Sequence, residues 1–425
     1  MKIMVVGGGG REHAIIRKLK ENPSVETIWA LPGNGGIAQD AECVPIGAKD
    51  LDAITAFAVA NEIDFAVVAP DDPLVLGAVD RLEAKGIPCF GPRKNAAIIE
   101  GSKAFAKELM KKYGIPTADY ETFEDMDSAL QYLRTADMPI VVKADGLALG
   151  KGVLICRTRE EAEAAVRSMM ADRIFGESGA RVVIEAFLEG PEVSVLSFTD
   201  GETIVPMVSS MDHKRALDHD QGLNTGGMGA VAPNPFYTPE VAARCMREIF
   251  LPTIRAMKAE GRPFRGCLYF GLMITRDGPK VIEYNCRFGD PETQVVLPLL
   301  KTDLLTVMRA VSAGRLRDVP VAFSDGAACC LILASGGYPT RYEKGREIVI
   351  TDAARLSRAD VFHAGTALKD GKLVTAGGRV LGLTCTADTL EEAVAGAYDA
   401  AQGIAFEGAY YRKDIGARAL KQHRE

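Results

Sequence analysis

Features that mark several classes of protein are missing from this 425-residue sequence. Its nine cysteines are odd in number, and none forms a Cys-x-x-Cys pair, which argues against a disulfide framework and a structural zinc site. No apolar run reaches the roughly 18 to 20 residues that a membrane-spanning helix needs. The N-terminus enters a predicted strand without the apolar region and cleavage site of a signal peptide. We therefore expect a cytoplasmic protein with reduced thiols.

The charge balance and the nucleophile motifs narrow the function further. The formal net charge is −7, so no basic excess is present to neutralise the phosphates of a nucleic acid. Gly-x-Ser-x-Gly is absent, and Ser, Cys and His form no recognisable catalytic triad motif. We expect neither a nucleic-acid nor a membrane partner, and no covalent nucleophile.

The first hundred residues alternate between short apolar strands and helical patterns. This order predicts a parallel, doubly wound sheet with ligands beyond the carboxyl ends of its strands. The expected strands cover 3–6, 27–31, 65–69 and 88–90, and the expected helices cover 11–21, 50–61 and 73–85.

A glycine turn at residues 7–10 follows the first strand. It fits the opening of a dinucleotide-binding fingerprint, but the third glycine would fall on Glu12 or His13. The acid expected about twenty residues later is replaced by Ala30-Leu31-Pro32. What remains is either an anion site at a helix N-terminus or a tight structural turn.

Beyond residue 100 the pattern changes to a mixed α+β order. A helix at 102–113 precedes an α+β unit, with strands at 139–143, 153–156 and 181–187 and a helix at 159–171. Strands at 192–199, 203–209, 267–275 and 279–287 and a helix at 291–314 follow. A third unit from about 325 has strands at 327–334 and 380–386 and a helix at 388–402, and it holds few candidate catalytic residues.

The most informative stretch is Val281 to Glu292. Alternate residues of a strand share a face, so Glu283 and Asn285 point the same way. Hard oxygen ligands of this kind suit Mg²⁺, which binds one or two protein ligands together with substrate phosphates. Arg287 continues the face and suits a phosphate or a carboxylate. A polar, solvated strand face is the alternative interpretation.

A glycine-rich connection at 144–152 lies between two expected strands, so it is not a P-loop. Such a hairpin can act as a flap whose backbone N–H groups and Lys151 face phosphates, with Lys143 and Lys103 as further cations. The alternative is a flexible surface hairpin.

Two further polar segments are candidates. Acids at Glu185 and Glu192 could hydrogen-bond a ribose, although acids at a strand junction are usually only solvated. The segment 212–229 is polar, glycine-rich and predicted to be without regular structure, which in a compact domain indicates function or disorder. Its His213 could act as a general base or only as a hydrogen-bonding group.

Together these motifs resemble the ATP-grasp ligases, and more narrowly the phosphoribosylamine–glycine ligase family. The matching segments run along the whole chain: residues 7–13, 32–34, 143–148, 212–215, 224–229, 285–294 and 411–416. Two departures are Asp71, where the family usually has Glu after Gly-Pro, and Leu149, where a smaller residue is common. The shorter acid could weaken a contact to the ribosyl substrate, and Leu149 should alter packing only.

The resemblance implies a fold of mixed class, α/β and α+β. It implies an N-terminal substrate-binding domain at 1–101, an ATP-grasp domain at 102–324 with a flap subdomain at about 117–188, and a small C-terminal domain at 325–425. It also implies ATP and Mg²⁺ or Mn²⁺ as cofactors, glycine and 5-phosphoribosylamine as substrates, and a monomer or weak dimer.

The resemblance implies a reaction in two steps. ATP phosphorylates the glycine carboxylate, and the amine of phosphoribosylamine then displaces phosphate from the glycyl phosphate to give glycinamide ribonucleotide. Catalytic roles fall to Arg287, Lys143, Asp212 and Lys214, and the metal ligands are Glu283 and Asn285. The implied ATP site is Lys103, Lys143, Gly146, Gly150, Lys151, Glu185, Ala186, Leu188 and Glu192. The implied substrate site is Gly9, Glu12, Asn34, Asp212, Lys214, Arg215, Asn224, Thr225, Gly226, Arg287, Gly289, Asp290 and Pro291.

Two alternatives remain at this point. Another ATP-grasp carboxylate–amine ligase or carboxylase of purine metabolism would use the same ATP and metal residues. A nucleotide sensor without catalysis would keep Lys143 and Glu192 but could dispense with Glu283 and Asn285.

Overall fold

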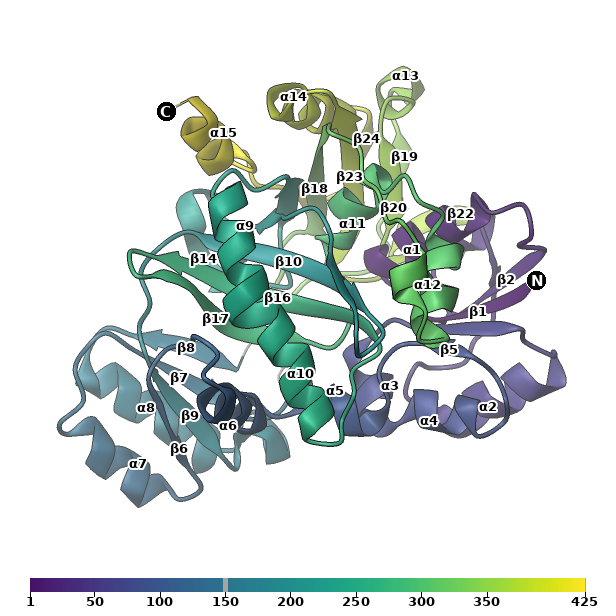
Figure 1. Ribbon diagram of the computed structural model, residues 1–425. Coiled ribbons are helices and arrows are strands. Elements are labelled where there is room, and N and C mark those ends of the chain that lie inside the picture. The colour runs from purple at the N-terminus through teal and green to yellow at the C-terminus, as the bar shows by residue number, and fades with distance from the viewer. Residues whose placement is uncertain (148–151, 425) are drawn as a thin grey trace.

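The computed structural model describes residues 1–147 and 152–424. The chain forms three regions, each built around a β-sheet, and the N-terminal region borders both the central and the C-terminal region (Figure 1). The mixed α/β and α+β class predicted from the sequence is confirmed.

The N-terminal region is a five-stranded parallel sheet in the order β3-β2-β1-β4-β5. Its order reverses at β1, so the carboxyl ends of β1 and β4 frame a ligand crevice. The predicted helix at 73–85 is wrong in one respect, because Gly77 adopts a φ of 99° and splits it in two. The elements are β1 Lys2–Gly7, α1 Gly10–Lys20, β2 Thr27–Pro32, β3 Glu42–Cys43, α2 Leu51–Ala60, β4 Phe65–Val68, α3 Asp71–Leu76, α4 Ala78–Glu83, β5 Cys89–Phe90 and α5 Lys94–Gly101.

The central region contains two four-stranded sheets. The first has the order β6-β9-β7-β8 and belongs to the α+β unit at the lower left of Figure 1. Its elements are α6 Lys103–Tyr113, β6 Tyr120–Phe123, α7 Met126–Leu133, β7 Ile140–Ala144, β8 Val153–Cys156, α8 Arg159–Met170 and β9 Val182–Ala186.

The second central sheet has the order β11-β10-β16-β17, and a helix with a π-helical turn at Met246–Phe250 lies over it. The predicted helix at 291–314 is wrong as a single element. Residues 300–303 interrupt it, and Asp303 caps the second helix by accepting from the Thr306 N–H at 2.7 Å. The elements are β10 Glu192–Thr199, β11 Ile204–Pro206, α9 Pro239–Cys245, α10 Leu251–Ala259, β16 Gly266–Thr275, β17 Gly278–Asn285, α11 Thr293–Val296 and α12 Leu304–Ser312.

The C-terminal sheet has the order β12-β15-β18-β23-β20, with β25 also pairing with β18. Two of its strands, β12 and β15, lie at the two ends of the segment 212–229. Between them in the sequence, β13 and β14 form a separate hairpin. The prediction that this segment lacks regular structure is therefore wrong. The strands are β12 Met211–Asp212, β13 Arg215–Leu217, β14 Gln221–Asn224, β15 Gly229–Ala232, β18 Ala327–Ser335, β20 Asp360–His363, β23 Arg379–Ala387 and β25 Ala409–Tyr410.

Smaller ribbons and helices complete this region. Two ribbons, β19-β24 and β21-β22, flank the main sheet, and α14 packs on it. These elements are β19 Val349–Ile350, α13 Ala353–Leu356, β21 Thr366–Lys369, β22 Lys372–Thr375, α14 Leu390–Ala401, β24 Ile404–Ala405 and α15 Ala417–Arg424.

Three phenylalanines join the N-terminal region to the central sheet. Phe90 of β5, Phe198 of β10 and Phe288 after β17 have ring centroids 5.8 to 6.3 Å apart. All three are buried, and each contributes about 1.5–3 kcal/mol through burial of its apolar surface. Phe288 therefore anchors the chain directly after Arg287.

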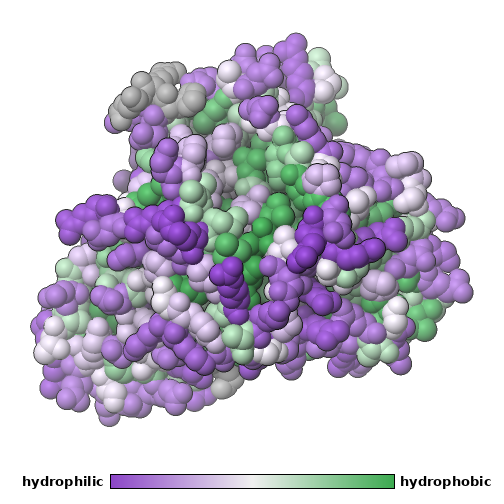
Figure 2. Space-filling model, viewed as in Figure 1, coloured by the Kyte–Doolittle hydropathy of each residue, from purple (hydrophilic) through white to green (hydrophobic). Residues whose placement is uncertain are grey.

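The surface of the face in Figure 2 is largely hydrophilic, with apolar residues gathered in its middle between α10 and α12. Among the residues that the structure describes, no helix is long and apolar enough to cross a membrane.

Candidate functional site

A cavity of about 1130 Å³ lies where the three regions meet. Its lining includes Arg11 from the N-terminal region, Lys143 and Glu283 from the central sheets, and Arg379 from the C-terminal sheet. The volume suits a nucleotide together with a second small substrate. The predicted residues that line it are Lys103, Lys143, Glu185, Ala186, Leu188, Glu192, Asp212, Lys214, Arg215, Asn224, Thr225, Gly226, Glu283, Asn285, Arg287 and Asp290.

One end of the cavity holds a buried group of three charges. Glu185 of β9 lies between Lys143 of β7, at 2.9 Å, and Lys107 of α6, at 3.2 Å. Lys107 also donates to Thr117 Oγ1 at 2.7 Å and to the Ala118 carbonyl at 3.2 Å. Burial lowers the pKa of Lys107 to about 8, although Glu185 opposes this shift. The sequence interpretation missed Lys107, since a lysine in an amphipathic helix normally faces solvent.

Lys103 begins α6 at the base of the predicted flap. Its Nζ donates to the Gly146 carbonyl at 2.9 Å, and Asp145 accepts from the Ala104 N–H at 2.7 Å. Burial lowers the pKa of Lys103, with the nearby Lys143 acting in the same direction. Of the predicted flap residues, Leu149, Gly150 and Lys151 lie outside the residues that the structure describes.

Glu283 and Asn285 are alternate residues on one face of β17, and an irregularity in the pairing just before them turns that face toward the cavity. Gly271 of β16 pairs with Glu283, but the next residue, Leu272, pairs with Val281. The extra residue, Ile282, forms a β-bulge, so the residues after it point to the opposite face from the one that an unbroken strand would give them. As a result Val281 is buried in the core while Glu283 lines the cavity, and the Ile282 carbonyl accepts from Lys143 Nζ at 3.0 Å.

The pair of Glu283 and Asn285 has the chemistry of a small metal site. Burial opposes ionisation of Glu283, but the surrounding cations, Lys214 and Lys143 first, outweigh it and hold its pKa below the usual value. Among the described residues, no group of three or more His, Cys, Asp or Glu side chains could hold a metal ion alone. Two hard oxygen donors fit Mg²⁺ or Mn²⁺ that takes its other ligands from phosphates and water.

Arg287 is oriented by a residue that the sequence interpretation missed. Its guanidinium donates to Glu100 of α5 at 3.1 Å and to Asn285 Oδ1 at 3.4 Å. Glu100 also accepts from the Cys286 N–H at 2.7 Å, and burial raises the pKa of Glu100. Arg287 Nε is buried without a hydrogen-bond partner among the described residues. No local sequence pattern distinguishes Glu100 from any other helical glutamate.

Lys214 links the two ends of the cavity. Its Nζ lies 3.1 Å from Glu192 and 3.7 Å from Glu283. Beyond it lie Asp212, whose Oδ1 is buried without a hydrogen-bond partner among the described residues, and Glu292. Burial, and then the charge of Glu292, raises the pKa of Asp212 well above its usual value.

Arg379 of β23 is a second residue that the sequence interpretation missed. It donates to the carbonyls of Gly226 and Asp290, both at 2.8 Å, and lies 3.4 Å from the Asp290 carboxylate. Burial opposes ionisation of Asp290, but Arg379 and Arg11 hold its pKa below the usual value. Arg379 therefore joins the segment 226–227 to the turn at 289–291. Its sequence context, Gly-Gly-Arg-Val, carries no signal of this role.

The hairpin of β13 and β14 carries Arg215, Asn224 and Thr225. Arg215 donates to the Gly222 carbonyl at 2.8 Å, and Thr225 Oγ1 donates to the Lys214 carbonyl at 2.8 Å. Buried Arg412 donates to the Arg215 carbonyl at 3.1 Å and so fixes the hairpin to the C-terminal region.

His213 is held between two backbone groups. Its Nε2 accepts from the Gly416 N–H at 3.2 Å, which leaves Nδ1–H to donate to the Gly229 carbonyl at 3.2 Å. Burial lowers its pKa to about 4. These contacts match the hydrogen-bonding interpretation of His213 and leave no free nitrogen for a general base.

The remaining predicted site residues that the structure describes, Gly146 of the ATP set and five of the substrate set, surround the cavity without lining it. Glu12 accepts from the Gly9 N–H at 2.6 Å and caps α1, and Gly9 lies close to Asp290. Both oxygen and nitrogen of the Asn34 amide are taken by protein groups. Gly146, Gly289 and Pro291 lie in the turns next to the lining residues.

Comparison with known proteins is decisive for the family. The three family models for phosphoribosylglycinamide synthetase match this chain in order: the N domain over 1–100, the ATP-grasp (A) domain over 101–293 and the C domain over 328–418. A phosphoribosylamine–glycine ligase of Caldanaerobacter subterraneus is 48% identical over 417 residues, covering 98% of this chain and 100% of its own length. One of Vibrio vulnificus is 48% identical over 428 residues, covering 100% of both chains.

The chain belongs to the phosphoribosylamine–glycine ligase family. The family predicted from the sequence is thereby confirmed. The crystal structure of the phosphoribosylamine–glycine ligase from Thermotoga maritima has a TM-score of 0.86 and 36% identity, covering 98% of this chain and 100% of that one. The biotin carboxylase domain of the Hydrogenobacter thermophilus 2-oxoglutarate carboxylase, solved with MgADP, has a TM-score of 0.75 at 19% identity, covering 100% of this chain and 97% of that one, and shows a shared fold.

Proposed function

We propose that this protein joins glycine to 5-phosphoribosylamine at the expense of ATP, through glycyl phosphate, to give glycinamide ribonucleotide, ADP and phosphate in purine synthesis. Relatives at 48% identity over the whole chain are named for this reaction. The observation that carries the proposal is a cavity in which cations from β7, from the turn after β17 and from the segment after β12 surround Glu283 and Asn285. The three expected domains, 1–101, 102–324 and 325–425, supply its walls.

The nucleotide would occupy the end of the cavity that contains Lys143, Glu185 and Glu192. Lys143 is oriented toward the phosphates by Glu185 and by the Ile282 carbonyl. Lys103 would add a second positive charge, and Ala186 and Leu188 line the same end as apolar and backbone contacts for the base. We assign Gly146, Gly150 and Lys151 of the flap to the phosphates by the resemblance alone.

Glu283 and Asn285 would hold the metal ion. When bound, Mg²⁺ or Mn²⁺ supplies positive charge beside the phosphates. The first step brings two anions together, the glycine carboxylate and the γ-phosphoryl group, and each unit pair of charges about 4 Å apart costs about 4 kcal/mol at an effective dielectric constant near 20. Lys214 and Arg287 lie on either side of this pair of ligands, so they would offset the repulsion and orient the carboxylate for attack.

The second substrate would lie between the hairpin and the first region. Arg215, Asn224, Thr225, Gly226 and Asp290 line the cavity there, and Gly9, Glu12, Gly289 and Pro291 lie in the turns next to that lining. The raised pKa of Asp212 makes its ionised carboxylate a stronger base than an ordinary aspartate, so this carboxylate would receive the proton that the attacking amine releases. Asn34 would act indirectly, by holding the backbone of its loop in place, because both ends of its amide are bonded to protein groups.

The test is ADP release by the purified protein with Mg²⁺. ADP should appear when glycine and phosphoribosylamine are both supplied, and other small carboxylic acids should not replace glycine. Release of ADP with formate or bicarbonate and a purine intermediate would instead support another ATP-grasp enzyme. We also propose that the protein is cytoplasmic, binds no nucleic acid and is a monomer or weak dimer. Sedimentation of the purified protein tests its oligomeric state.

A further inference from the structure

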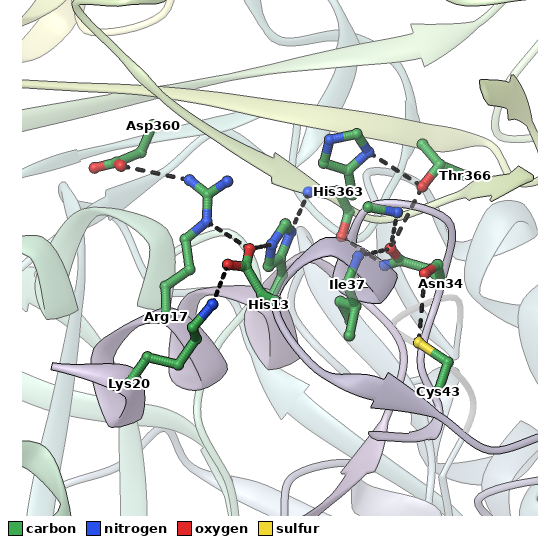
Figure 3. A network of polar contacts seen from close by, with 11 residues as sticks. His13, Arg17, Lys20, Asn34, Ile37, Cys43, Asp360, His363 and Thr366 are labelled. Atoms are coloured by element: carbon green, nitrogen blue, oxygen red, sulfur yellow. Dashed lines mark hydrogen bonds and ion pairs between the residues drawn. The ribbon is translucent and has the colours of Figure 1, made fainter. Parts of the chain in front are cut away.

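His13 closes the glycine turn motif of the N-terminal region but does not line the cavity. Its ring is fully buried on the first turn of α1 and faces β20 of the C-terminal region (Figure 3). Nδ1 lies 2.8 Å from the His363 backbone nitrogen, and Nε2 lies 2.9 Å from Asp40 Oδ2. A backbone N–H can only donate and a carboxylate can only accept. His13 must therefore be a neutral imidazole with its proton on Nε2.

The same peptide of the C-terminal region is held from its other side by the second glycine loop. The His363 carbonyl accepts from Asn34 Nδ2 at 2.8 Å, and that amide also donates to the Gly8 carbonyl at 3.0 Å. The oxygen of the Asn34 amide accepts from the N–H groups of Gly36 and Ile37, both at 2.9 Å. His363 thus ties the loops after β1 and β2 together through its two backbone groups.

The glycines of this second loop make room for that contact. A Cβ on Gly36 would lie 1.9 Å from Cγ of the His363 ring, and one on Gly35 would lie 2.7 Å from the backbone of Ala367. The Gly35 N–H donates to the Thr366 carbonyl at 3.0 Å. The sequence Pro-Gly-Asn-Gly-Gly is therefore shaped by a protein contact along its second half.

Several charged groups surround His13. Asp40 also contacts Arg17 at 3.2 Å and Lys20 at 2.8 Å, and Arg17 reaches Asp360 of β20 at 3.5 Å. Burial lowers the pKa of His13, with Arg17 and Lys20 acting in the same direction and Asp40 against them. The neutral form required by the hydrogen bonds is thus also the form that the surroundings favour.

We propose that His13 is a positioning residue, which uses the turn from His363 to Thr366 of the C-terminal region to hold the two loops that receive phosphoribosylamine. The inference rests on the proposed function, because the proposed function assigns the glycine turn at 7–10 and the loop of Asn34 to the binding of phosphoribosylamine. The C-terminal region is then a part of the substrate site of the first region, and not only a cover over the cavity.

Two variants separate the hydrogen bond from the bulk of the ring. In His13→Asn the amide oxygen lies as many bonds from the backbone as Nδ1, so it can still accept from the His363 N–H. In His13→Gln the amide nitrogen replaces Nε2 and can still donate to Asp40, but the acceptor for His363 is lost. We expect His13→Gln to raise the KM for phosphoribosylamine about tenfold, in the range expected when a buried N–H loses its partner. His13→Asn should stay within about threefold of the parent protein.

The KM values for ATP and glycine should change less than about twofold in both variants, because the contacts of Lys143 and Lys214 are untouched. Asp360→Asn is the matched control: it removes an exposed ion pair between the same two regions, and all three KM values should stay unchanged. A direct readout is the ¹⁵N spectrum of histidine-labelled protein, in which the His13 signal, absent from His13→Gln, should show the Nε2–H tautomer from about pH 6 to about pH 8.

Three outcomes would overturn the proposal: an unchanged KM for phosphoribosylamine in His13→Gln, an equal rise of all three KM values, or a His13 signal of the imidazolium or the Nδ1–H tautomer. Absence of ADP release from the parent protein would count against the proposed function itself. The tautomer can be read in either case.

Discussion

The buried group of Glu185, Lys107 and Lys143 leads to a prediction about stability as well as activity. All three side chains are at most 6% exposed, and the carboxylate lies between the two ammonium groups. Glu185→Gln keeps the shape but leaves two buried cations without a carboxylate. Removing one partner of a buried ion pair typically costs about 3–5 kcal/mol, so we expect a loss of that order in the free energy of unfolding while both lysines stay protonated in the variant.

The loss should depend on pH with a sign that the structure sets. Lys107 has a folded-state pKa of about 8, below its ordinary value of 10.5, chiefly because it is buried and despite the opposing effect of Glu185. Without Glu185 this pKa falls further. Between the variant's pKa and about 8, the parent protein keeps a proton that the folded variant has lost. The deficit of Glu185→Gln should therefore shrink by about 1.4 kcal/mol for each pH unit in that window.

Lys107→Met is the matched control, and its stability relative to the parent protein should change with pH above about pH 8 instead of below it. The parent binds fewer protons when folded than when unfolded between about pH 8 and 10.5, so its stability rises with pH there. Over that window the free energy of unfolding of the parent protein should rise by ~3 kcal/mol relative to that of Lys107→Met, because the variant has no proton to lose at this site.

Calorimetric unfolding from about pH 6 to about pH 10 measures both windows, with stability compared at each pH. A deficit of Glu185→Gln that stays constant across pH would refute the reasoning, because Lys107 would then be insensitive to Glu185. The KM for ATP should rise in Glu185→Gln at all pH values, since Lys143 loses the group that orients it.

Three further predictions follow from other contacts. Asn285→Ala should raise the Mg²⁺ concentration needed for half-maximal ADP release by at least about tenfold, and a normal magnesium titration would remove Asn285 from the metal site. Arg379→Met should raise the KM for glycine and phosphoribosylamine while leaving that for ATP within about twofold, because its side chain donates to the carbonyls of Gly226, Gly227 and Asp290. Phe288→Ala should lower stability by about 3–5 kcal/mol in calorimetric unfolding, and a smaller loss would mean that the three-ring contact collapses around the gap.

Local sequence patterns predicted much of the fold correctly. The four predicted strands of the first region are short, largely apolar runs, and the structure places each within a residue or so of its predicted bounds. The two-residue strand β3, Glu42–Cys43, was missed. The helix errors arose where one residue overrides a continuous pattern, as with the left-handed Gly77 and the capping Asp303. The strands at 211–232 were missed because they are short, and because β15 is held in the main sheet by β18, about a hundred residues away in the sequence.

Most predicted site residues line the cavity, and many of them belong to motifs that carry the family resemblance. Their individual roles stay predictions. Glu100, Lys107 and Arg379 were missed for one shared reason. Each acts by orienting another side chain or a backbone segment across a long sequence separation, and such a partner leaves no periodic or compositional mark in a single sequence.

Strand β17 shows why alternation alone is an incomplete argument for the facing of Glu283 and Asn285. Alternation alone places Glu283 and Asn285 on one face, but it also places Val281 there, and Val281 is fully buried in the core. An unbroken strand could not satisfy both, since a face cannot be apolar core at one position and charged cavity wall two residues later. The bulge at Ile282 resolves the conflict by inserting one residue between them, and its free carbonyl becomes the partner of Lys143. One irregular pairing thus sets the direction in which Glu283 and Asn285 face and gives Lys143 of the neighbouring sheet a hydrogen-bond acceptor, so that residues of two different sheets meet in the same part of the cavity.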